Sequence, residues 1–336
     1  MKYLPWMSVM LVVSQSLLGC SDDKSDDAAS AGSSSTAGKS ASAGSAGKGS
    51  SVGGSSSQGG STGEAGEGGT AAAEPKDIVD TALAAGTFTE LAKALTAAGL
   101  VDALKGEGPF TVFAPTDDAF AAFEEENPGV LGKLSKAELT AVLTYHVVAG
   151  AAVKSTALKD EQVFVTLNGS PLLIDTTGGV KASDAEVTAA DVEASNGVIH
   201  VIDKIMLPPA DDIVETAIAA GMFTKLAGAL TAAELVDTLK GEGPFTVFAP
   251  TDDAFDELAA VPTGDALKDV LLYHVVSGAV GSGDLVAGPV PTLLEDKSVT
   301  VSLTGGVKID AAKVTTANII TKNGVIHVVD TVLVPE

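Results

Sequence analysis

The chain has 336 residues, 45% of them hydrophobic, which is enough to form packed domain cores. Acidic side chains number 44 against 20 basic ones, all of them Lys, and the formal net charge is −24. Affinity for nucleic acid begins with phosphate neutralisation by Lys and Arg, so this composition excludes nucleic acid as a partner. The absence of Arg also disfavours phosphoryl transfer, because Arg is the usual bidentate clamp for phosphate.

The first twenty residues are expected to direct export. Lys2 precedes a short apolar stretch, which ends in Leu17-Leu18-Gly19-Cys20. This stretch is shorter than the ~20 residues of a membrane-spanning helix, which favours a cleaved signal peptide over residues 1–20. A small residue before a lone cysteine resembles the bacterial lipobox, and the resemblance implies lipid on Cys20. The alternatives are an ordinary secretory signal with an incidental cysteine, or a signal anchor.

Residues 21–75 consist mainly of Ser, Gly and Ala, with almost no bulky side chain. Such a segment cannot bury enough apolar area to offset the entropy of ordering its backbone, so we predict a disordered tether. A tether of this length would hold folded domains away from a membrane. Ser21, rather than an aspartate, follows the cysteine, and by enterobacterial sorting rules this favours the outer membrane.

The rest of the chain contains one sequence twice. Residues 104–120 (LKGEGPFTVFAPTDDAF) recur letter for letter as residues 239–255. The period of about 130 residues is too long for a solenoid repeat, so we predict two domains, 76–208 and 209–336. The first copy has seven additional residues between Phe120 and Thr140, in a segment with consecutive glutamates and a Pro-Gly pair. We predict a surface loop there.

Apolar spacing predicts helices over residues 77–85 and 87–98, a helical turn over 100–104, and a further helix over 139–145. Thr116 and its equivalent Thr251 are predicted helix N-caps. Each is followed by two aspartates in the first helical turn, where the helix dipole favours negative charge. We interpret these aspartates as structural rather than metal-binding.

A strand is predicted over residues 110–115, where β-branched and aromatic residues lie between Gly-Pro and Pro. Short alternating segments after residue 163 are separated by hairpin-turn signals at Asn168-Gly169 and Gly178-Gly179. Helices followed by a β-rich half within about 130 residues indicate an α+β domain rather than a doubly wound sheet.

Three sequence blocks occur in the same order in both repeats: FTVFAPTDDAF, then YHVV, then NGVIHV followed by a proline. In this order and spacing they resemble the signature blocks of the fasciclin-like domain family. The resemblance implies two domains, each a compact wedge of mixed β-sheet with helices packed on one side. It also implies a surface or secreted protein, because the family includes bacterial surface proteins and animal matrix and adhesion proteins.

The four histidines occupy equivalent places, two in each repeat. His200 and His327 alternate with apolar residues along a predicted strand, so we interpret them as structural rather than as metal ligands or catalytic bases. In animal relatives the Tyr-His block is associated with integrin binding. The resemblance therefore implies partner binding at four residues, with a buried Tyr–His hydrogen bond as the alternative. These residues are Tyr145, His146, Tyr273 and His274.

No nucleophile elbow, Walker-type loop or metal-ligand spacing is present in the sequence, so we predict no catalytic residue, no metal, no cofactor and no enzyme activity. The favoured function is a lipid-anchored adhesion or interaction module at a bacterial cell surface. Its partners would be a protein or an extracellular matrix component, and the membrane through the N-terminal lipid. The alternative is a periplasmic or surface binding protein for a small molecule or polysaccharide. A hydrolase would need a deep pocket that holds a histidine and a carboxylate.

Overall fold

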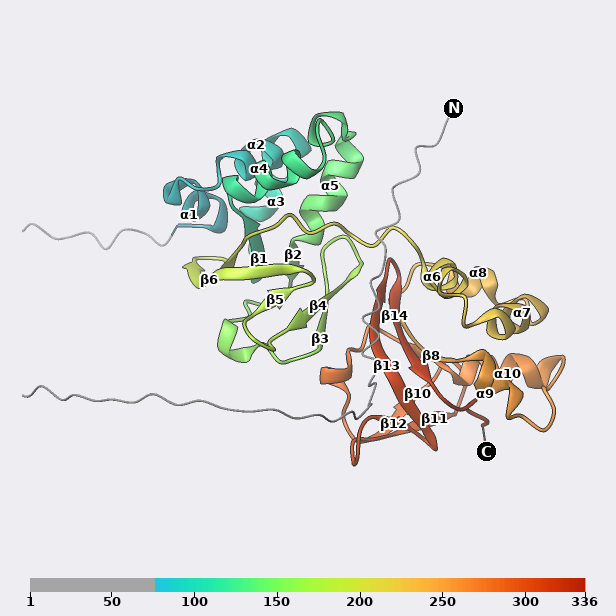
Figure 1. Ribbon diagram of the computed structural model, residues 1–336. Helices are drawn as coiled ribbons and strands as arrows, with labels where there is room; N and C mark the ends of the chain where they lie inside the picture. The colour runs from blue at the N-terminus through green and yellow to red at the C-terminus, as the bar shows by residue number, and fades with distance from the viewer. Residues whose placement is uncertain (1–75, 336) are drawn as a thin grey trace, which may run out of the picture. The chain divides into compact units, whose positions relative to one another are not determined.

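The computed structural model describes residues 76–335 (Figure 1). The predicted signal peptide, Cys20 and the tether over 21–75 lie outside the described residues. Each repeat begins with helices and continues into its own seven-stranded sheet. The predicted α+β class with helices packed on a mixed sheet is confirmed.

The predicted helices of the first repeat are present as α1 (Ile78–Ala85), α2 (Thr89–Ala98) and α3 (Val101–Leu104). Asp77 caps α1 by accepting a hydrogen bond from Asp80 N. Both α1 and α2 end at a glycine with φ of 75°, a left-handed conformation that glycine adopts without steric cost.

The first sheet has the strand order β2-β1-β7-β6-β5-β4-β3. Its strands are β1 (Phe110–Pro115), β2 (Val147–Ala149), β3 (Gln162–Val165), β4 (Pro171–Asp175), β5 (Lys181–Ala182), β6 (Ala185–Ala194) and β7 (Gly197–Ile202). The strand predicted over 110–115 is therefore confirmed. It lies next to β7 in parallel and pairs Phe113 with His200, while the other neighbouring strands are antiparallel.

The seven additional residues of the first repeat do not form the predicted surface loop. Helix α4 (Asp117–Glu126) continues through much of this segment, a 3-10 turn follows at Leu131–Lys133, and α5 (Lys136–Tyr145) then begins. The equivalent helix of the second repeat, α9 (Asp252–Asp256), is half as long. Phe123 extends α4 by packing against the helical core, and α4 ends at the residue pair Asn127-Pro128, because a following proline disfavours helical backbone.

Each face of the first sheet carries a separate core. Val112 and Ala114 of β1 face the core shared with α1, α2 and α5, whereas Phe113 between them faces a second core with Leu172 and Ile202. This alternation follows from the two-residue period of a strand and leaves β1 buried on both sides. The central strand β1 therefore separates the two cores of the repeat.

The second repeat has the same succession of elements. Its helices are α6 (Ile213–Ala220), α7 (Thr224–Ala232), α8 (Val236–Leu239), α9 and α10 (Asp265–Tyr273). Its strands are β8 (Phe245–Pro250), β9 (Val275–Ser277), β10 (Gly288–Pro291), β11 (Ser298–Ser302), β12 (Lys308–Ile309), β13 (Ala312–Thr321) and β14 (Gly324–Val329). Short 3-10 turns occupy equivalent places at η2 (Ser155–Ala157) and η3 (Ser282–Asp284). Within residues 76–335, no helix is long and apolar enough to cross a membrane.

Candidate functional site

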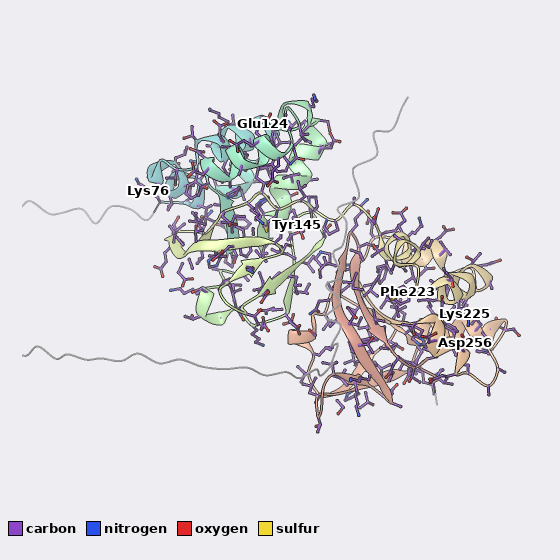
Figure 2. All side chains as sticks on the ribbon, in the orientation of Figure 1. Lys76, Glu124, Tyr145, Phe223, Lys225 and Asp256 are labelled. Carbon is purple, nitrogen blue, oxygen red and sulfur yellow. The ribbon has the colours of Figure 1, made fainter. Side chains whose placement is uncertain are left out.

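The Tyr-His pairs lie at the ends of α5 and α10, where each helix passes into a strand. Figure 2 shows the side chain of Tyr145 in the interior of the first repeat, and only 1% of its surface is exposed. Its hydroxyl donates to the backbone oxygen of Pro171 at 3.1 Å. Burial, with the nearby charge of Asp184 adding to it, raises the pKa of Tyr145 to about 12.

His146 joins two distant backbone segments. Its Nδ1 lies 2.7 Å from the oxygen of Val142, one turn earlier in α5, and its Nε2 accepts from Met206 N at 3.0 Å. A carbonyl on one side and an N–H on the other fix a neutral imidazole with the proton on Nδ1. Burial lowers the pKa of His146 to about 4, although the bond to Val142 acts in the opposite direction.

His274 repeats this arrangement in the second repeat. Its Nδ1 lies 2.7 Å from the oxygen of Val270, and its Nε2 accepts from Leu333 N at 2.9 Å. Burial again lowers its pKa to about 4.

The hydroxyl of Tyr273 donates to the backbone oxygen of Ser298 at 3.0 Å and to the carboxylate of Asp310 at 2.9 Å. All four Tyr and His side chains of the two pairs are buried. The hydrogen bonds of Tyr145 and His146 run to backbone groups of Pro171, Val142 and Met206, and the role of the two pairs, partner binding or structure, stays a prediction.

His200 and His327 occupy the middle of β7 and β14. His200 Nε2 lies 2.9 Å from the oxygen of Val153, and its Nδ1 accepts from Asp191 N at 3.4 Å. His327 makes the same pair of contacts, to Val280 and Asn318, and burial lowers its pKa. In both cases one ring nitrogen donates to and the other accepts from the backbone, as a neutral structural histidine requires. The structural role stays a prediction until the variants are measured.

Thr116 and Thr251 accept hydrogen bonds from the backbone three residues later, at Ala119 N and Ala254 N. The aspartates that follow also cap a neighbouring helix, a role that the sequence does not reveal. Asp252 Oδ1 accepts from Lys225 N, at the start of α7, at 2.8 Å. Hydrogen bonds from the Thr224 hydroxyl and from this N–H hold the pKa of Asp252 below its ordinary value. Figure 2 shows Lys225 beside Asp256, with which it forms an ion pair.

Asn196 and Asn323, the first residues of the two NGVIHV blocks, connect helices to the sheet. The Oδ1 of Asn323 accepts from Ile213 N at 3.0 Å, and its Nδ2 donates to the oxygens of Leu239 and Gly241. Asn196 makes the same three bonds in the first repeat. The recurrence of NGVIHV in both repeats is the only sequence signal that could have directed attention to the amide.

An open groove of about 510 Å³ runs along α1 and α2. Ala82, Leu83, Phe88 and Lys93 are among its lining residues, which include no histidine and no carboxylate. Leu83 is 54% exposed, and its equivalent Ile218 on α6 is 61% exposed. A large apolar side chain is therefore presented to solvent at the same place in both repeats.

The architecture is a tandem of α+β domains, each with a seven-stranded sheet, and the chain belongs to the fasciclin domain family. The family model matches residues 86–208 and 221–335. The resemblance that the three sequence blocks indicated is thereby confirmed.

Relatives share either one repeat or both with this chain. The uncharacterized protein sll1735 of Synechocystis is 44% identical over 39% of this chain and 97% of its own length. Protein sll1483 of the same organism is 47% identical over 39% of this chain and 73% of its own length. Transforming growth factor-beta-induced protein ig-h3 of Sus scrofa is 30% identical over 69% of this chain but 36% of its own length. The solved structure of a FAS1 domain pair from the insect cell adhesion molecule fasciclin I is 19% identical with a TM-score of 0.33, covering 74% of this chain and 97% of that chain.

Proposed function

We propose that the protein is a lipid-anchored surface module that binds a protein or matrix partner through its tandem fasciclin domains and has no enzyme activity. The observation that carries this proposal is the family match over both repeats, because fasciclin domains are linked to cell adhesion in homologous proteins. Lipid on Cys20 would supply the attachment, and the Ser/Gly/Ala-rich segment 21–75 would supply the reach.

The binding surface is inferred to include Leu83 and Ile218. The four histidines have both ring nitrogens bonded to backbone, so partner contact falls to outward-facing side chains. An exposed apolar residue of this size gains free energy when a partner covers it. Two equivalent copies on one chain would allow bivalent attachment, which raises the apparent affinity without new contacts.

Cell attachment tests the partner-binding proposal. Cells that carry the wild-type chain should attach to their native matrix more strongly than cells that lack it, and a Leu83→Lys/Ile218→Lys double variant should lose most of this difference. The control is Ala103→Lys/Thr238→Lys, which adds the same charge at exposed equivalent positions on α3 and α8. Equal attachment with and without the protein would contradict the proposed function, and an equal loss in both double variants would contradict the assigned surface.

Lipid anchoring has a separate test. We expect Cys20→Ala to move the protein from the detergent phase to the aqueous phase, because the lipid chains that hold it in the membrane cannot be attached. The wild-type chain measured in the same extract is the control. If the variant still partitions into detergent, the anchor does not depend on Cys20.

A further inference from the structure

The second repeat departs from the first at four positions that lie beside the first repeat. Both repeats belong to one compact unit of the chain. At η3 the second repeat has Gly281-Ser-Gly-Asp284, where the first has Lys154-Ser-Thr-Ala157 at η2. Three of the four differences are thus Gly281 for Lys154, Gly283 for Thr156 and Asp284 for Ala157. The fourth is Asn318, which replaces Asp191. The serines that begin both turns confirm the alignment, because Ser155 N and Ser282 N donate to Asp191 and Asn318 respectively.

Gly281, which precedes η3, and Gly283 within it are not required by the backbone of their own repeat. Gly281 has φ of −76° and ψ of 160°, almost the same as Lys154 at −79° and 155°, and neither Gly281 nor Gly283 has a positive φ. The first repeat therefore accommodates side chains at both positions in the same local structure, with Lys154 and Thr156.

The first repeat occupies the space that side chains at these glycines would need. A Cβ on Gly283 would lie 1.9 Å from the backbone oxygen of Asp160, and a Cβ on Gly281 would lie 2.3 Å from the backbone oxygen of Glu161. In both cases the three nearest atoms belong to the first repeat. Glycine at these positions thus permits the close approach of another backbone.

Hydrogen bonds use this close approach. Gly283 N donates to the oxygen of Glu161 at 3.1 Å, and Val163 N donates to the carboxylate of Asp284 at 2.9 Å. The hydroxyl of Ser282 donates to the carboxylate of Glu161. The first repeat has Ala157 where Asp284 stands, and so has no acceptor for an equivalent of the Val163 bond.

The exchange of Asp191 for Asn318 makes the serine proton available. In the first repeat the carboxylate of Asp191 accepts both from Ser155 N at 2.7 Å and from the Ser155 hydroxyl at 2.5 Å. In the second repeat Asn318 Nδ2 donates to the Ser282 oxygen at 2.7 Å instead. Because the amide occupies the serine as an acceptor, the Ser282 proton points to Glu161.

We propose that residues 281–284, with Asn318, form a docking element for residues 160–163 of the first repeat, and that this contact holds the two fasciclin domains in one fixed orientation. The contact joins unlike surfaces, and such a contact would build open chains if it could repeat between molecules. The first repeat cannot act as a second docking element, because Lys154 and Thr156 carry side chains where Gly281 and Gly283 have none. The second repeat cannot act as a second acceptor surface, because Gly288 stands where Glu161 accepts the Ser282 hydroxyl. The docking element is therefore specific for a single pairing within the chain.

The orientation of the two domains can be measured directly. Spin labels at Thr96→Cys and Thr231→Cys, two exposed equivalent positions on α2 and α7, are placed in a full chain that carries Cys20→Ala. We expect one narrow distance distribution in this background. Adding Gly283→Thr, which introduces the residue that the first repeat has at this place, should broaden the distribution or shift it.

The matched control is Thr156→Gly, the reverse exchange in the first repeat, which should leave the narrow distribution unchanged. Circular dichroism of the Gly283→Thr chain should match the background, because the added side chain meets only the first repeat. A broad distribution in the background, or a narrow and unshifted one after Gly283→Thr, would overturn the proposal. Loss of folded signal on Gly283→Thr would also overturn it, since the glycine would then serve its own repeat.

Discussion

At the scale of single residues, each neutral imidazole bridges two backbone groups through hydrogen bonds from its two ring nitrogens. Each histidine has a donor nitrogen and an acceptor nitrogen at fixed separation, so it can join a carbonyl to an N–H that lie far apart in sequence. His146 does this between Val142 and Met206, and His200 between Val153 and Asp191. A protonated ring has no acceptor, so protonation breaks one of the two bonds.

Stability should therefore fall in mild acid. The folded pKa of His146 and of His274 is about 4, below the ordinary 6.5 of an exposed histidine. Between these values the unfolded chain binds the additional protons, so the contribution of each histidine is complete above pH ~6.5 and is lost as the pH falls toward 4. Each contributes a slope of up to about 1.4 kcal/mol per pH unit. Urea unfolding across this window should show the slope, and His146→Ala should reduce it. Leu143→Ala, a nearby buried change without a titrating group, should not.

Removal of a strand histidine should destabilise the fold without affecting metal content. We expect His200→Ala or His327→Ala to lower the free energy of unfolding by about 2–4 kcal/mol, because packing is lost and two backbone groups are left unpaired. Thermal unfolding measures the loss, and elemental analysis of wild type purified without chelator provides the control. A stoichiometric metal that disappears in His200→Ala, with little change in melting temperature, would contradict the structural role.

At the scale of elements, local signals determine what the sequence can predict. Gly86, Gly99 and the residues around Pro115 delimit α1, α2 and β1 as expected, because turn and cap chemistry acts over a few residues. The prediction of a surface loop after Phe120 is wrong, because Phe123 packs against a core formed by distant elements and α4 continues past it. For the same reason the sequence does not decide between an exposed and a buried position for the Tyr-His pairs, and it does not predict the parallel pairing of β1 with β7.

The amide of Asn323 connects α6 and α8 to β14, so its removal should destabilise both helices. We expect Asn323→Ala to lower the free energy of unfolding by about 2–3 kcal/mol, since three bonded backbone groups lose their partner. Asn323→Asp keeps the acceptor for Ile213 N but removes both donations. Hydrogen exchange should then show Ile213 still protected in Asn323→Asp and unprotected in Asn323→Ala. Equal protection in the two variants would exclude this capping role.

At the scale of the whole molecule, each repeat has its own sheet and its own hydrophobic cores. All seven strands of each sheet come from one repeat, and each of the four hydrophobic cores draws its residues from one repeat. The docking element adds polar contacts between the repeats but takes no residue from a core. The hydrophobic cores therefore determine the stability of each repeat, and the docking element determines how the two repeats are oriented.

We therefore predict that residues 76–208 and 209–336 fold as independent domains. Each fragment should unfold in one cooperative thermal transition, because about 130 residues around their own cores suffice for a stable domain. Gly283→Thr should leave the melting temperature of the 209–336 fragment unchanged, since the first repeat, whose atoms the new side chain would meet, is absent. The same substitution should uncouple the domains in the full chain. A fragment that melts without cooperativity would mean that the tandem is the folding unit, and a destabilised Gly283→Thr fragment would mean that the glycine belongs to the fold of its own repeat.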